Sequence, residues 1–227
     1  MSAVFFLKKS IYSLIINVLM LTFTIGNIAY AYVVNHASIL PLNKRFYFLV
    51  ADSTHVETSA HFAVLSGGAG YLLEYNDNCY ATISVYLTKM EGEKAAKSLK
   101  SQGTKLVEVS AEAVYLKTKK EKSAAKYLQG AFDCLYACIK ILNGEIVRLD
   151  NGATQESGER ILRELEKQFS YLQEEYKKIF PLFSRLCDTA VKSLEIMRSD
   201  IIYVRDLRYL QCELCNGYRK LSQEFCV

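Results

Sequence analysis

The chain has 227 residues and a formal net charge of +4, and 51% of its residues are hydrophobic. This mild basic excess does not by itself indicate a nucleic-acid-binding protein. The sequence has no GxSxG, no HExxH and no phosphate-binding glycine loop, and its three histidines are not spaced as metal ligands. It therefore predicts neither an enzyme nor a metal or cofactor site.

Residues 11–34 form one uncharged apolar run, which Lys8 and Lys9 precede. A helix of this length is more than enough to cross a hydrocarbon core of about 30 Å, and it satisfies its own backbone there. The run therefore predicts a single-pass transmembrane anchor. Because lysine favours the cytoplasmic side, we expect residues 1–10 in the cytoplasm and residues 35–227 outside the cell membrane.

Two other interpretations of the run remain open. Ala29 and Ala31 form an A-x-A pattern after the apolar stretch, as in a cleaved secretory signal. A buried core helix would also be apolar, although few core helices are so long. The cleaved signal, like the anchor, would export the rest of the chain.

After a predicted linker at 35–45, residues 46–116 read as a small α+β unit. Aromatic and β-branched residues predict strands, and small apolar residues at helical spacing, followed by glycines, predict helices. The predicted strands are 46–51, 71–75, 79–88 and 104–110, and the predicted helices are 54–65 and 90–101. The order βαββαβ is that of the ferredoxin-like arrangement. We expect it to pack both helices on one face of the sheet and to leave the other face open.

Alternation along the predicted strand 79–88 separates a polar face from an apolar one. The apolar face is the natural core, and the polar face, which Tyr47 shares by parity, is expected to be open. Tyrosine rings and hydroxyl groups on a shallow surface suit a glycan, although any half-buried strand has such a solvated face. The candidate binding residues are Tyr47, Tyr80, Thr82, Ser84 and Tyr86.

Residues 117–227 predict an antiparallel helical bundle. Apolar residues recur at steps of three and four over 124–146, 162–179 and 194–221. Pro181 predicts a turn, because the residue before a proline avoids the helical region. Such apolar stripes are usually intramolecular core, but they would also allow the bundle to bind another envelope protein.

The seven cysteines leave at least one thiol unpaired in an exported protein. Cys134 and Cys138 lie one helical turn apart, and Cys212 and Cys215 form a CxxC inside a helical pattern. These pairs could form disulfides or a thiolate metal site. Their positions on or beside apolar stripes favour the simpler interpretation, in which they are small buried residues.

The α+β unit resembles the SPOR domain, a sporulation-related, peptidoglycan-binding module with two pseudo-repeats. The similar segments are FYFLVADS (46–53), CYATISVYLT (79–88) and EGEKAAKSLKSQG (91–103). Leu49 and Ala51 stand where the family often has a polar residue and a glycine. The resemblance implies an anchored bacterial envelope protein that binds peptidoglycan glycan strands during sporulation or cell division. The alternative is a membrane-tethered scaffold whose bundle binds another envelope protein.

Overall fold

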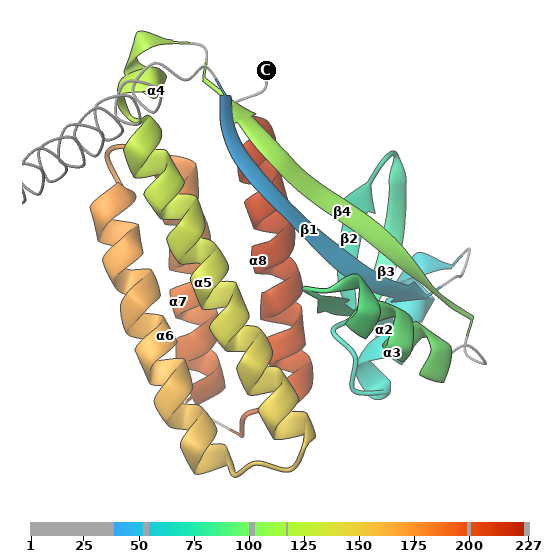
Figure 1. The fold of residues 1–227 in the computed structure, drawn as a ribbon. Coiled ribbons are helices and arrows are strands. Elements are labelled where there is room, and N and C mark those ends of the chain that lie inside the picture. The colour runs from blue at the N-terminus through green and yellow to red at the C-terminus, as the bar shows by residue number, and fades with distance from the viewer. Residues whose placement is uncertain (1–38, 52–54, 100–102, 117, 199–200, 225–227) are drawn as a thin grey trace, which may run out of the picture.

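A computed structural model describes residues 39–51, 55–99, 103–116, 118–198 and 201–224. They form a mixed α+β structure in which a four-stranded antiparallel sheet lies beside a group of long helices (Figure 1). The predicted transmembrane anchor lies outside the described residues. Within the residues described, no helix combines the length and the apolar character that crossing a membrane requires.

The sheet and its two helices follow the predicted order βαββαβ. Neighbouring strands are antiparallel and lie in the order β2-β3-β1-β4, so the first strand is central. This is the split βαβ arrangement. The strands are β1 (Ile39–Ala51), β2 (Tyr71–Tyr75), β3 (Asn78–Tyr86) and β4 (Thr104–Tyr115), and the helices are α2 (Val56–Leu65) and α3 (Lys89–Ser98).

Strand β1 begins at Ile39, inside the predicted linker 35–45. The early part of β1 pairs with β4 alone, which is extended to match it. Leu40 and Leu42 are buried at alternate positions, so packing holds this extension in strand form. Pro41 is tolerated because this end of β1 has a hydrogen-bonded neighbour on one side only.

Helices α2 and α3 cover one face of the sheet. A glycine makes the close approach of α3 possible. A Cβ atom on Gly92 would lie 2.9 Å from Cδ1 of Leu106 and 3.4 Å from Cβ of Tyr47, which are on strands beneath the helix. Thr88 caps the start of α3, because its Oγ1 accepts a hydrogen bond from the backbone N–H of Glu91 (3.3 Å).

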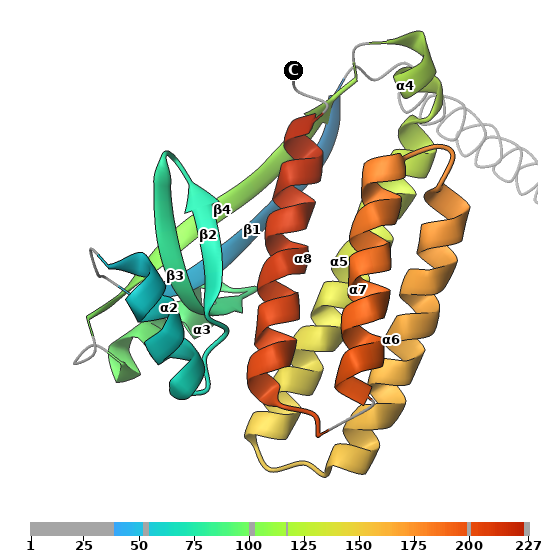
Figure 2. The same cartoon turned by 180° about the vertical axis from the view of Figure 1, so that it is seen from behind.

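The rest of the described chain forms the helical bundle that the apolar stripes predict. Its long helices run up and down in alternation (Figures 1 and 2). Pro181 is the first residue of α7, so it starts a helix after a turn, as predicted, rather than kinking one. The helices are α4 (Lys119–Ser123), α5 (Ala125–Asp150), α6 (Gln155–Tyr176), α7 (Pro181–Arg198) and α8 (Val204–Glu224).

Helix α8 packs against the sheet face opposite to α2 and α3 (Figure 2). Phe46 of β1 meets Tyr218 of α8 edge-on, with ring centroids 5.6 Å apart, and Tyr218 meets Phe132 of α5 at 5.0 Å. One hydrophobic core therefore runs from the sheet into the bundle. The expectation that this sheet face is open is wrong, because α8 covers it.

Candidate functional site

The five predicted binding residues do not share one face of the sheet. Ser84 of β3 pairs with Leu49 of β1, but the next residue of β1, Val50, pairs with Thr82, so Ile83 is an extra residue in a β-bulge. The Ile83 carbonyl accepts a backbone hydrogen bond of 2.7 Å from the loop after α2. In a regular strand, Thr82 and Ser84 would point to the same face, because side chains alternate. The extra residue between them puts Thr82 and Ser84 on opposite faces of the sheet.

Tyr80 and Thr82, which precede the bulge, lie on the face that α8 covers. The partner of Thr82 on β2 is Tyr71, whose hydroxyl accepts a hydrogen bond from the Asn216 amide of α8 (2.9 Å). Thr82 is fully buried at 0% exposure. Tyr80 is partly buried, and Nζ of Lys105 lies 5.3 Å from the centroid of its ring. These two residues therefore line an internal interface.

Tyr47, Ser84 and Tyr86 lie on the other face, beside α3. Tyr47 is buried under Gly92, and its ring is out of reach of a ligand. Ser84 and Tyr86 lie at the end of β3, where they line a cleft that opens toward the bundle; Ser84 is buried in its wall, and Tyr86 is partly exposed. Of the predicted set, the structure brings these two residues together at one accessible site.

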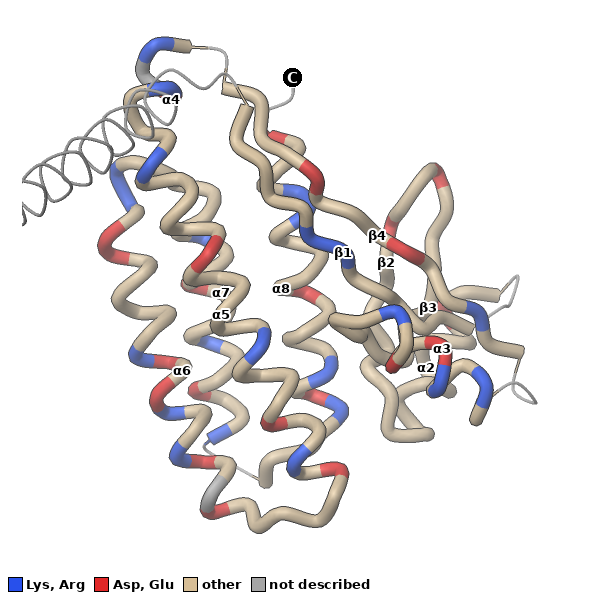
Figure 3. Tube along the Cα trace, in the orientation of Figure 1, with Lys and Arg blue, Asp and Glu red and all other residues tan. Residues whose placement is uncertain are grey.

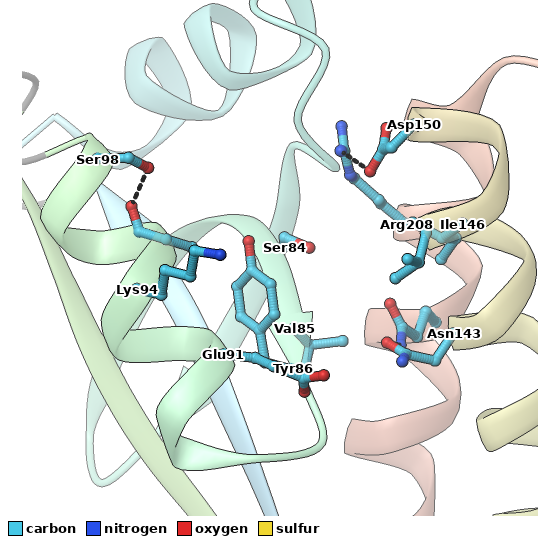
Figure 4. Close-up of a pocket in the computed structure, with 13 residues that line it drawn as sticks. Ser84, Val85, Tyr86, Glu91, Lys94, Ser98, Asn143, Ile146, Asp150 and Arg208 are labelled. Carbon is cyan, nitrogen blue, oxygen red and sulfur yellow. Dashed lines mark hydrogen bonds and ion pairs between the residues drawn. The ribbon is translucent and has the colours of Figure 1, made fainter. Parts of the chain in front are cut away.

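The cleft has a volume of about 400 Å³ and lies between the α/β unit and the bundle (Figure 4). Strand β3 and helix α3 form one wall, and helices α5 and α8 form the other. Clefts between packed units are common ligand sites, and this volume lies within the usual range. The lining residues are Ser84, Val85, Tyr86, Glu91, Lys94, Ala95, Ser98, Asn143, Ile146, Val147, Asp150, Arg208 and Gln211.

The α/β wall presents an aromatic ring, hydroxyl groups and one lysine. Burial of Tyr86 raises the pKa of its phenol above the usual value, against a smaller opposing effect of the neighbouring Ser84 hydroxyl, so the phenol stays protonated at neutral pH. Lys94 is exposed on α3, and its ammonium group points into the cleft (Figure 4). Glu91 is held near the start of α3, because its carboxylate accepts a hydrogen bond from the hydroxyl of Thr88 (2.7 Å).

The bundle wall is fixed by contacts between distant segments. Arg208 of α8 donates one hydrogen bond to Oδ2 of Asp150 at the end of α5 (2.7 Å) and another to the carbonyl of Gly67 after α2 (2.5 Å). Nε2 of Gln211 donates to Oδ1 of Asn143 (2.8 Å). These bonds join α8 to α5 and to the α2–β2 loop, so they set the width of the cleft.

The cleft combines both signs of charge with amides, hydroxyls and one aromatic ring. Such a lining suits a polar ligand that offers hydroxyl, amide and ionic groups, because each group finds a partner of the opposite kind. In the part of the chain that the structure describes, no three histidine, cysteine or carboxylate side chains are grouped as metal ligands.

Three of the four cysteines in the two predicted pairs are buried, as the simpler interpretation predicts. Cys138, Cys212 and Cys215 are buried, and the six described cysteines are free thiols. Burial raises the pKa of Cys138 to about 11 and that of Cys187, on α7, to about 12, so both stay protonated at neutral pH. Cys134 differs from its predicted partner because it is exposed.

A second depression, of about 440 Å³, runs between α5 and α6. Its floor is largely apolar, with Ala137, Ile141 and Leu165 among the lining side chains, and Cys134 lies at its edge. Ile141 is 49% exposed, which is high for such a side chain. This groove has few polar groups that would orient a small ligand, so it resembles a surface for contact with another protein.

Comparison with known proteins identifies no relative: no family model matches the chain, and no curated protein or solved structure matches it significantly. The candidate site is therefore argued from its own geometry.

Sequence reasoning missed most of the cleft. Lys94, Asn143, Asp150 and Arg208 come from three helices, and the residues that meet are up to 141 positions apart, as for Arg208 and Gly67. Nothing in the local pattern of any one helix marks these residues as different from a solvated face. Only the packing of α8 against the sheet brings them together.

Proposed function

We propose that this chain is a non-catalytic bacterial envelope protein that binds peptidoglycan glycan strands, in sporulation or cell division. The apolar run at 11–34 would anchor it in the cell membrane, with the described residues on the outer side. The resemblance to the SPOR domain supports the ligand class. The βαββαβ order and the strand order β2-β3-β1-β4 are compatible with that resemblance.

The ligand site in this proposal is the cleft and not an open sheet. The observation that carries it is that Ser84 and Tyr86, two of the predicted binding residues, line an accessible cleft together with charged side chains from α3, α5 and α8. Tyr47, Tyr80 and Thr82 do not line the cleft, and they support the fold around it instead.

The chemistry of peptidoglycan matches this lining. Its amino sugars carry hydroxyl and amide groups, and its short peptides carry carboxylates and amines. The Tyr86 ring offers an apolar face to a sugar, and the partly exposed amide of Asn143 offers hydrogen bonds, while Gln211 is buried behind it. Lys94 would pair with a carboxylate of the ligand, because no ion pair occupies its ammonium group among the described residues.

Sedimentation of the full chain with purified cell-wall sacculi tests the proposal. The variant Lys94→Ala is expected to bind about tenfold more weakly, which corresponds to the loss of one hydrogen bond to a charged group. Tyr86→Phe, which removes only the phenolic hydroxyl group and keeps the ring, is expected to weaken binding by less. Lys94 is exposed and Tyr86→Phe keeps the aromatic ring, so thermal unfolding should show that both variants fold like the wild-type chain.

Lys97→Ala is the matched control. Lys97 is an exposed lysine of the same helix that does not line the cleft, so its loss changes the net charge equally. Equal binding by the wild-type chain and the Lys94 variant would show that the cleft is not the ligand site. If the full chain remains in the supernatant when the sacculi are sedimented, peptidoglycan is not its ligand.

The α5–α6 groove favours a second candidate, a membrane-tethered scaffold whose bundle binds another envelope protein. The exposed thiol of Cys134 beside this groove allows a direct test with a photo-crosslinker attached to it. The scaffold predicts one crosslinked product in whole cells, which the groove variant Ile141→Glu abolishes. A crosslinker on the exposed Cys79 of β3 is the control.

A further inference from the structure

One end of the molecule gathers lysines and exposed aromatic residues. Figures 1 and 2 show the start of β1, the end of β4, helix α4 and the start of α5 at the same end. Ile39, Tyr115 and Tyr127 are about half exposed there, at 48%, 50% and 55%. We call this surface the lysine end, and it comprises Ile39, Tyr115, Lys119, Lys122, Lys126 and Tyr127.

The lysine end holds the excess charge of the protein. The segment 117–127 has five lysines and one glutamate, a net charge of +4, which equals the net charge of the whole chain. Lys119 and Lys126 are exposed and Lys122 is partly exposed. The one acidic residue, Glu121, is engaged locally, because its carboxylate accepts a hydrogen bond from the backbone N–H of Thr118 (2.9 Å). Lysines colour α4 and the start of α5 blue in Figure 3.

Chain length places this end next to the proposed anchor. Four residues, 35–38, separate the apolar run from Ile39, the first residue of β1. A fully extended chain spans at most about 3.6 Å per residue, so Ile39 lies within about 18 Å of the end of the run. The opposite end of the molecule is much farther away, since α8 alone, with 21 residues, is about 30 Å long.

We propose that the lysine end is a membrane-contacting surface, which binds the phosphate groups of anionic lipids and inserts its tyrosines at the headgroup level. Each juxtamembrane lysine increases the affinity for anionic lipid about fivefold, and tyrosine side chains favour the membrane–water interface. The contact fixes the orientation of the domain, with the α5–α6 and α7–α8 turns directed away from the bilayer. The inference rests on the proposed anchor but not on the proposed ligand or on which side of the membrane the domain lies.

The chain has no tryptophan, so a single introduced tryptophan reports on one position. We would reconstitute the full chain in lipid nanodiscs as two variants, Tyr115→Trp at the lysine end and Tyr203→Trp beside the start of α8 at the other end. Both tyrosines are partly exposed, at 50% and 43%, so each replacement is tolerated. Quenching by brominated lipid measures contact with the bilayer.

In nanodiscs that contain phosphatidylglycerol, we expect strong quenching at position 115 and none at position 203. Quenching at 115 should fall at least fivefold in pure phosphatidylcholine, and equally in the triple variant Lys119→Gln, Lys122→Gln, Lys126→Gln. The triple variant Lys89→Gln, Lys97→Gln, Lys140→Gln removes the same charge from α3 and the middle of α5 and should leave quenching unchanged.

Two results would overturn the inference: no quenching at 115 in anionic nanodiscs, or the same quenching whatever the lipid charge. Failure of the chain to remain with the nanodiscs would reject the anchor. Failure in the sacculus experiment has no bearing on the lipid contact, so the two proposals are tested separately.

Discussion

Single glycines set how closely the helices of this protein approach one another. Gly217 of α8 faces α7, and a Cβ atom there would lie 2.7 Å from Cδ1 of Leu186. Gly144 of α5 differs, because it is exposed and nothing lies within 4 Å of the same position. The first glycine is therefore required for packing, whereas the second only weakens its helix.

Substituting alanine at these two positions should have opposite effects. Gly144→Ala is expected to raise the free energy of unfolding by about 1 kcal/mol, because alanine favours a helix interior by that amount. Gly217→Ala is expected to lower it, since the strain of displacing Leu186 exceeds the helix propensity gained. Urea unfolding followed by circular dichroism measures both, and a shift of the same sign in the two variants would contradict the packing argument.

The sequence predicted which residues are buried better than it predicted which face of the sheet a side chain occupies. Cys138, Cys212 and Cys215 were correctly expected in the core, because helical periodicity fixes which face a residue occupies, whereas the same expectation for Cys134 was wrong, since it is exposed. The orientation of Ser84 and Tyr86 was not predicted, because Ile83 fits a regular strand as well as a bulge and nothing in its chemistry marks the extra residue. A single bulge is enough to change the face of every later side chain.

Among the elements, α8 links the parts of the fold. Arg208 joins it to the end of α5 through Asp150 and to the α2–β2 loop through Gly67, while Tyr218 joins the sheet to α5. The position of α8 against the sheet had a signal in the sequence. FYFLV at 46–50 is apolar without alternation, which is typical of a strand that is buried on both faces.

Breaking the contacts of Arg208 should loosen the loop after α2. Arg208→Gln is expected to lower the free energy of unfolding by about 1–2 kcal/mol, because it removes a partly buried hydrogen bond to Gly67 and an exposed one to Asp150, both made by a charged group. Amide exchange of residues 67–70 should accelerate. Arg205→Gln on the same helix is the control, because its ion pair with Asp206 is long (3.4 Å) and exposed and contributes little.

At the scale of the whole molecule, the sheet and the bundle share one core. Phe46, Phe48 and Val50 of β1 are each 0% exposed, and this face of the strand lies against α8. Complete burial of such side chains contributes roughly 2 kcal/mol each, so the three together approach the total stability of a typical domain. The sheet is therefore not expected to be stable without the bundle.

A chain that ends at Leu116 tests this interdependence. It keeps the α/β unit but lacks the helices that cover its second face, and we expect it to show little amide dispersion in an NMR spectrum and no cooperative thermal transition. The full chain under the same conditions is the control. A cooperatively folded fragment would show that the bundle is a separate unit that merely rests on the sheet.

The position of β1 also has a mechanical consequence. Its 13 residues extend for about 40 Å, and hydrogen bonds join it to β4 along most of this length and to β3 over Tyr47–Val50. The strand is also the first described element after the proposed anchor. In the proposed function, tension between the membrane and a bound wall polymer would therefore pull β1 along its own axis. Rupture would then require many of these bonds to shear together rather than to unzip one at a time.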